Sequence, residues 1–180
     1  PGAKGLFQRA IVESGSYAES VPTLAQAETT GGALATTMGC GDQTAACLRA
    51  LPVSTLLAAE TQLTQLPNLG SVLPQQYAAA VRTGDFNRVP VLSGTNHDEW
   101  MIFVDLLKSQ LGNPVTAANY QAQIASELQL PSAAAAAPIA AAYPVGAYPT
   151  PYNALGAVGT DAIFACNARE DVQSLSQYVP

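Results

Sequence analysis

The sequence predicts an α/β fold in which two short strands are surrounded by several helices. The strands are Ala10–Val12, ended by the turn residues Ser14 and Gly15, and residues 89–93, ended by Gly-Thr-Asn. The second strand is a continuous apolar run, which is typical of strands buried on both faces of a sheet. A sheet of two strands has edges with nothing to pair them. Either further strands lie outside these 180 residues or the strand assignment is wrong.

Helical spacing of apolar residues fills most of the segment between the two strands. We expect helices over residues 23–38, 44–51, 54–62 and 75–83, with turn-rich sequence over residues 66–74. Gly31-Gly32 interrupts the first helical pattern, and Pro52 ends the second. Ser54 is predicted to cap the third helix, and Gly84 follows the fourth where a terminating glycine belongs.

The segment after the second strand is also predicted to be mainly helical. A helix is expected from residue 116 towards residue 128, and residues 133–142 are nearly all alanine and prone to form helix. Residues 143–151 are predicted to form a loop, and residues 153–177 a long, mostly helical segment.

Composition excludes several classes of protein. Hydrophobic residues make up 48% of the chain and charged residues 11%, which argues against a disordered segment. The net charge of −6 argues against binding to nucleic acid or to an anionic membrane surface. No apolar run is long enough to span a membrane. The opening residues Pro1-Gly2-Ala3 read as the interior of a longer protein, so we expect the chain to be a piece of one.

Three cysteines give two alternatives for their chemistry. Cys40 and Cys47 either form a short disulfide that ties one helix end to the next helix or remain two buried thiols. Asp42 is a candidate cap for the helix that carries Cys47. A metal site is not expected, because the spacing is wrong and no histidine lies nearby. Cys166 is either a buried thiol or half of a bridge to a residue outside these 180.

Glu99 is the main candidate for chemistry, and two interpretations of it stand side by side. Asn96 followed by Glu99 resembles a capping box at a helix start. Alternatively, Glu99 is a carboxylate just past the carboxyl end of a strand, placed to orient a catalytic histidine. His97, the only histidine, is two residues away and badly placed to face Glu99, so we expect an exposed loop histidine.

A serine nucleophile is not evident in these residues. The Gly-x-Ser-x-Gly pattern of a strand-to-helix nucleophile turn is absent. Ser14 comes closest but lacks the first glycine. It either supports a nearby acid by a hydrogen bond or satisfies its own turn backbone.

Four segments, in order along the chain, together resemble the type-B carboxylesterase family of the α/β-hydrolase fold. They are residues 4–16, the Cys40–Arg49 segment, residues 84–99 and residues 160–166. The resemblance implies that Glu99 is the acid of a catalytic triad and that Ser14 lies beside it. It also implies a Cys40–Cys47 disulfide.

The resemblance further implies a substrate and a mechanism. The substrates would be small-molecule carboxylic esters, cleaved through a serine ester with backbone amides holding the oxyanion, without cofactor or metal. Ile102 and Phe103 would lie near the wall of the substrate gorge. Trp100 stands where the family usually has glycine, and it would either narrow the site or pack under the following helix. A secreted, extracellular or periplasmic location would follow from the disulfide and the family habit.

The remaining catalytic parts are expected outside these residues. The nucleophile would precede Pro1 and the catalytic histidine would follow Pro180, so residues 1–180 would be part of one domain, truncated at both ends. This chain alone is then expected to be inactive. A non-catalytic esterase-like binding or adhesion module is the alternative from another class, and a generic helical secreted domain is a third. No pattern indicates an oligomeric state.

Overall fold

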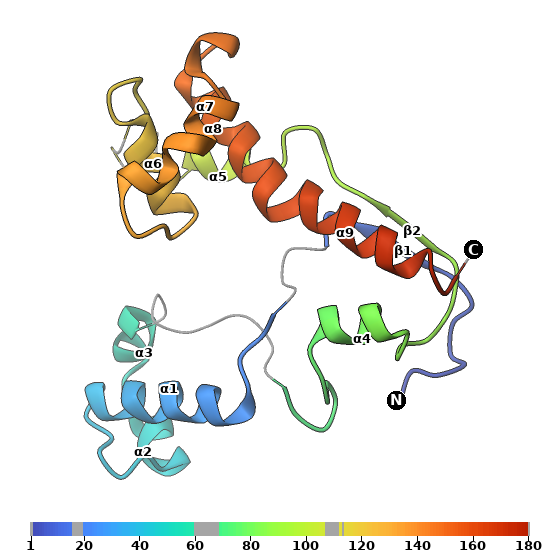
Figure 1. Ribbon diagram of the computed structural model, residues 1–180. Coiled ribbons are helices and arrows are strands. Elements are labelled where there is room, and N and C mark those ends of the chain that lie inside the picture. The colour runs from blue at the N-terminus through green and yellow to red at the C-terminus, as the bar shows by residue number, and fades with distance from the viewer. Residues whose placement is uncertain (1, 16–19, 60–68, 107–111, 113, 180) are drawn as a thin grey trace. The chain divides into compact units, whose positions relative to one another are not determined.

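The computed structural model describes residues 2–15, 20–59, 69–106, 112 and 114–179. The chain divides into two compact units (Figure 1). The first comprises residues 18–83 with the first two residues, and the second comprises residues 3–17 and 84–180. Within the described ranges, no helix is both long enough and apolar enough to cross a membrane.

The first unit is built from helices. They are α1 (Leu24–Thr37), α2 (Ala45–Ala50), α3 (Val53–Ala59) and α4 (Tyr77–Thr83). Helix α1 begins with a capping box, in which Thr23 accepts a hydrogen bond from the Gln26 backbone and the Gln26 side chain accepts one from the Thr23 backbone. This helix continues through Gly31-Gly32, so the interruption of its apolar pattern does not break it.

Two predicted caps in the first unit are wrong. Thr44, not Asp42, caps α2, because the Thr44 hydroxyl accepts from the Cys47 N–H, 3.1 Å away. Asp42 instead accepts hydrogen bonds from the backbone and hydroxyl of Thr44. Ser54 lies inside the first turn of α3, because the Pro52 carbonyl already accepts from the N–H of Leu56.

The remaining expectations here concern helix α4, the glycine that follows it, and two segments that lie outside the described residues. Helix α4 starts two residues later than predicted, and Gly84 follows it with a φ of +74°, the left-handed conformation of a terminating glycine. The expected end of the third helix at residues 60–62 and the first part of the turn-rich segment, residues 66–68, lie outside the described residues.

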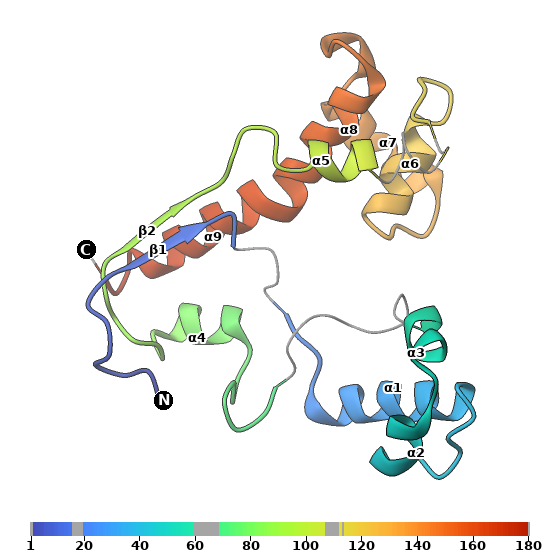
Figure 2. The same ribbon diagram turned by 180° about the vertical axis from the view of Figure 1, so that it is seen from behind.

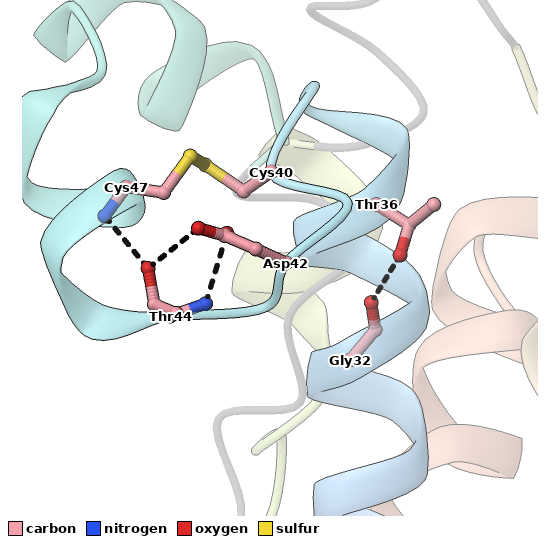
Figure 3. Close-up of a disulfide and its surroundings, with 6 residues drawn as sticks. All are labelled: Gly32, Thr36, Cys40, Asp42, Thr44 and Cys47. Carbon is pink, nitrogen blue, oxygen red and sulfur yellow. Dashed lines mark hydrogen bonds between the residues drawn. A yellow bond between two sulfur atoms is a disulfide. The ribbon is translucent and has the colours of Figure 1, made fainter.

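A disulfide joins Cys40, after the end of α1, to Cys47 in α2 (Figure 3). The two Cα atoms are 5.7 Å apart, and Cys40 is fully buried. The bonds of Asp42 and Thr44 organise the connection that this disulfide closes. The predicted disulfide is therefore present, whereas Cys166 is an exposed free thiol.

The second unit contains the two strands, β1 (Ala10–Glu13) and β2 (Val91–Gly94), which pair in parallel. Both strands were predicted, although β2 begins two residues later than expected. The expectation that this sheet is buried on both faces is wrong for the described residues. Ile11 and Leu92 point to the same face and are 67% and 68% exposed, because α9 packs only on the other side.

Several helical elements follow β2 in the second unit. They are α5 (Met101–Val104), α6 (Tyr120–Glu127), the 3₁₀ turn η3 (Ala133–Ala136), α7 (Ala137–Ala142), the 3₁₀ turn η4 (Val145–Ala147), α8 (Pro151–Gly159), the π-helical η5 (Thr160–Ala165) and α9 (Cys166–Leu175). The alanine-rich stretch is helical, as expected. Helix α6 starts four residues later than predicted, because Thr116 and Asn119 hydrogen-bond each other in a turn before it.

Elements α8, η5 and α9 form one long helix that runs alongside both α5 and β2 (Figures 1 and 2). It begins at Pro151 after the Thr150 cap, within the segment predicted to be a loop. Its first part packs against α5, and its last part packs against β2. The main core lies between this helix, α5, α6 and the alanine-rich stretch, and consists of Val104, Val115, Tyr120, Ile124, Ala125, Ala136, Ala154, Leu155 and Val158.

Candidate active site

The candidate site lies at the carboxyl edge of the two-stranded sheet. Because β1 and β2 are parallel, the residues that follow them meet at the same edge. Ser14 follows β1, and the turn that contains Asn96 and Glu99 follows β2. The sequence separates Ser14 from Glu99 by 85 positions, and the sheet brings them into contact.

Ser14 is held in a backbone conformation that L-residues other than asparagine and aspartate seldom adopt. Its φ is +57°, and its N–H donates to the carbonyl oxygen of Gly94 at 2.8 Å, which continues the pairing of the strands by one residue. From this position the Ser14 hydroxyl donates a hydrogen bond to Oε1 of Glu99. The left-handed turn thus directs the serine side chain to the acid.

The Glu99 carboxylate is fixed through one of its two oxygens. Oε1 accepts the backbone N–H of Asn96 at 2.7 Å, the Asn96 side-chain amide at 3.1 Å and the Ser14 hydroxyl. Within the described residues, Oε2 makes no hydrogen bond. The backbone bond from Asn96, followed by the Ser14 bond, lowers the pKa of Glu99 below its ordinary value. The group is therefore an ionised, oriented carboxylate at neutral pH.

His97 is an exposed loop histidine, as predicted. Its Nδ1 lies 3.1 Å from Oδ1 of Asp98, and both side chains are largely in solvent. The neighbouring residue along the turn, rather than Glu99, is therefore its contact.

Trp100 packs under the helices that follow it. The indole contacts the ring of Phe103, with 4.5 Å between centroids, and the ring of Phe164, at 6.2 Å. It also lies directly on Gly159, where an added Cβ would come within 2.1 Å of the indole Cδ1. The Trp100 backbone N–H donates to the hydroxyl of Thr160 at 3.0 Å. The long helix thus anchors the residue immediately after Glu99.

Apolar side chains and a pocket lie near this turn. Ile102 and Phe103 on α5 are exposed. A pocket of about 620 Å³ is lined by Ile11–Ser14 and Leu92–Asn96. Within the described ranges, no group of three or more histidine, cysteine, aspartate or glutamate side chains is arranged to hold a metal ion.

Sequence reasoning missed one polar contact of the site. Thr160 belongs to the resemblance segment 160–166, but no local pattern indicated that its hydroxyl would meet the Trp100 backbone. The sequence singled out Asn96 only as part of a capping box with Glu99. The structure contains one of the two hydrogen bonds of a capping box. The Asn96 backbone N–H reaches Glu99, but its side chain donates to the same carboxylate rather than capping a helix.

Comparison with known proteins decides the family. The carboxylesterase family pattern matches residues 1–178, nearly the whole chain. The chain belongs to the carboxylesterase family. This confirms the resemblance found in the sequence.

Two curated relatives are similar in sequence to this carboxylesterase-family chain. It is 31% identical over 118 residues to a protein named Cholinesterase 2 from Branchiostoma lanceolatum. It is 32% identical over 115 residues to a protein named Para-nitrobenzyl esterase from Bacillus subtilis (strain 168). The matches cover 58% and 57% of this chain, but only 35% and 23% of the two relatives. The chain thus corresponds to a minor part of their length.

Proposed function

We propose that Glu99 is the acid of a Ser-His-Glu triad in a carboxylic-ester hydrolase whose serine and histidine lie outside these 180 residues. The observation that carries the proposal is the unequal hydrogen bonding of the two carboxylate oxygens of Glu99. Three donors converge on Oε1, while Oε2 makes no hydrogen bond within the described residues. Such an arrangement suits a triad acid, since one oxygen is oriented and the other remains available to a histidine N–H.

The ionisation of Glu99 also suits this role. A triad acid stays charged during turnover, where it holds the imidazole in one tautomer and stabilises the imidazolium. The hydrogen bonds to Oε1 lower the Glu99 pKa and so keep the group ionised. The serine would attack the ester carbonyl to form an acyl-enzyme, which water then hydrolyses.

The family supports small-molecule carboxylic esters as substrates. Ile102 and Phe103 are exposed beyond the acid, and we assign them to the wall of the substrate gorge. Trp100 supports that wall from behind, because its indole packs against the Phe103 ring.

The same proposal extends to the fold and the location. An α/β-hydrolase sheet would continue beyond β1 and β2, and residues 1–180 would form part of that single domain. The exposed apolar side chains of Ile11 and Leu92 support this, because a complete fold would cover them. The Cys40–Cys47 disulfide supports an oxidising compartment, either extracellular or periplasmic.

A non-catalytic esterase-like binding module is the competing function. The bond from the Asn96 N–H to Glu99 is also expected for such a module, because a purely structural turn would use the same bond. A Gly-x-Ser-x-Gly motif upstream and a histidine downstream in the reading frame would favour the enzyme. A frame lacking either would favour the binding module.

The decisive experiment uses the protein encoded by the whole reading frame. We expect it to hydrolyse p-nitrophenyl esters, and Glu99→Gln to lower kcat by roughly 10³- to 10⁴-fold. Glu28→Gln is a matched control, because Glu28 is an exposed carboxylate on α1, in the other compact unit. Full activity in Glu99→Gln would refute the triad role.

A further inference from the structure

We propose that Thr160 is a positioning residue for Glu99, acting through the backbone of Trp100. The Thr160 hydroxyl accepts the Trp100 N–H and thereby fixes the turn that presents the acid. This inference rests on the proposed function of Glu99, which it deepens by naming a second support for the same carboxylate.

The hydrogen bond between Trp100 and Thr160 is partly buried and joins distant parts of the sequence. The Trp100 nitrogen and the Thr160 oxygen are 3.0 Å apart and 60 positions apart in the chain. Thr160 is only 4% exposed, so water competes little for this bond. Because the donor is the backbone N–H of the residue after Glu99, the bond constrains the main chain of the turn.

Close packing of Trp100 and Met101 against helix α8 supports the hydrogen bond between Trp100 and Thr160. The Trp100 indole lies against Gly159, and the Met101 side chain lies against Gly156, where added Cβ atoms would come within 2.1 and 2.2 Å of them. Two glycines one turn apart on α8 therefore let the residues after Glu99 approach the helix closely.

The element that carries Thr160 is itself braced. In η5 the helix widens, and the N–H of Cys166 bonds the carbonyl of Asp161 five residues back. The Tyr143 hydroxyl donates to Oδ2 of Asp161 at 2.6 Å, and the Tyr120 hydroxyl donates to the Tyr143 carbonyl at 2.9 Å. These bonds connect the π-helical turn that carries Thr160 to the core helix α6.

The turn is thus held from two directions. Ser14 holds the Glu99 carboxylate from the end of β1, and Thr160 holds the next peptide from η5. Three charged groups near the turn have contacts of their own, because His97 and Asp98 contact each other and Asp161 accepts the Tyr143 hydroxyl. The position of Glu99 therefore depends on hydrogen bonds more than on ion pairs.

The first test follows the Glu99 carboxyl by ¹³C NMR titration of the protein encoded by the whole reading frame. Thr160→Val removes the hydroxyl while keeping the shape of the side chain. We expect the Glu99 pKa to rise towards its ordinary value, because the bonds to Oε1 loosen. Thr160→Ser should titrate like the wild type. Thr36→Val, which removes a hydroxyl bonded to Gly32 in α1 (Figure 3), is the matched control.

The second test uses the protein encoded by the whole reading frame. There we expect Thr160→Val to lower kcat by roughly 10- to 100-fold with KM nearly unchanged, and Thr160→Ser to restore most of the rate. A kcat unaffected by Thr160→Val while Glu99→Gln abolishes turnover would overturn the inference and leave the proposed function standing. Full turnover in Glu99→Gln would refute the proposed function, and the NMR titration would still test the positioning.

A measurement on the wild-type chain needs no variant. The Trp100 amide hydrogen is expected to exchange slowly with solvent, in contrast to the amide of exposed His97 in the same turn. Rapid exchange of Trp100, or a Glu99 titration unchanged in a folded Thr160→Val chain, would overturn the inference. Circular dichroism of each variant establishes that it is folded.

Discussion

Ser14 donates its hydroxyl to Oε1 of Glu99, and the two residues are 85 positions apart in the sequence. The contact exists because two parallel strands end at the same edge and because the φ of Ser14 is +57°. A carboxylate, a hydroxyl and a backbone N–H therefore meet on one side of a turn. The conformation of a single serine backbone links the geometry of the sheet to the orientation of the acid.

Replacing Ser14 separates the hydrogen bond from the backbone conformation. Ser14→Ala and Ser14→Gly both remove the hydroxyl, so we expect both to raise the pKa of Glu99 in an NMR titration. Only glycine adopts the left-handed conformation without steric cost. Ser14→Gly should therefore be more stable than Ser14→Ala by about 1 kcal/mol in chemical unfolding. An unchanged Glu99 pKa in both variants would contradict the observed bond.

The lowered pKa of Glu99 predicts a pH dependence of stability. The folded state favours the ionised carboxylate, so the unfolded chain takes up a proton first as the pH falls. The contribution of Glu99 is complete above its ordinary value of 4.5 and is lost as the pH falls through the lowered folded value. Unfolding of the wild type and Glu99→Gln should therefore differ more at pH 7 than in strong acid. A difference independent of pH would contradict this.

Local sequence patterns predicted the elements whose signals are local. The strand at Ala10 and the terminating Gly84 follow from an apolar run and from the freedom of glycine. The cap of α2 was misassigned because Asp42 and Thr44 are both capping residues two positions apart. Only the exact start of the helix decides between them, and this is the feature that sequence specifies least.

The sequence indicated those residues of the candidate site that come directly after a strand. Glu99 and Ser14 were both singled out because each comes just after a strand, and only the family resemblance, not a local pattern, implied that they lie side by side. The Thr160 contact depends on how a helix 60 residues away docks on the turn. No pattern around Thr160 encodes that docking, and the packing of Trp100 on Gly159 is equally non-local.

The disulfide predicts a measurable contribution to stability. Closing the short loop between Cys40 and Cys47 should stabilise the chain by about 2–3 kcal/mol in the chain-entropy description. We expect the double variant Cys40→Ala, Cys47→Ala to lose this amount in urea unfolding. Cys166→Ala is the control, because that thiol is exposed and free. Equal stability of the double variant and the wild type would contradict the expectation.

The isolated 180-residue chain is expected to hydrolyse no ester at a measurable rate. It contains no Gly-x-Ser-x-Gly sequence, and its one histidine contacts Asp98 in solvent. Without a nucleophile and its base, an oriented carboxylate has no proton transfer to assist. Release of p-nitrophenol should equal that of buffer. Saturable turnover that is abolished by Ser14→Ala would contradict this and would make Ser14 a nucleophile.

Two helical glycines should respond to alanine in opposite ways. At Gly31 in α1 an added Cβ meets nothing within 4 Å, so Gly31→Ala should stabilise the chain by about 0.5–1 kcal/mol through helix propensity. At Gly159 the Cβ would meet the rigid Trp100 indole, so Gly159→Ala should destabilise by about 1–3 kcal/mol despite the same gain in propensity. Thermal unfolding and tryptophan fluorescence check both variants, since Trp100 is the only tryptophan. A stabilised Gly159→Ala with unchanged fluorescence would show that the indole does not lie on α8, and the turn after Glu99 would then lose its closest packing contact.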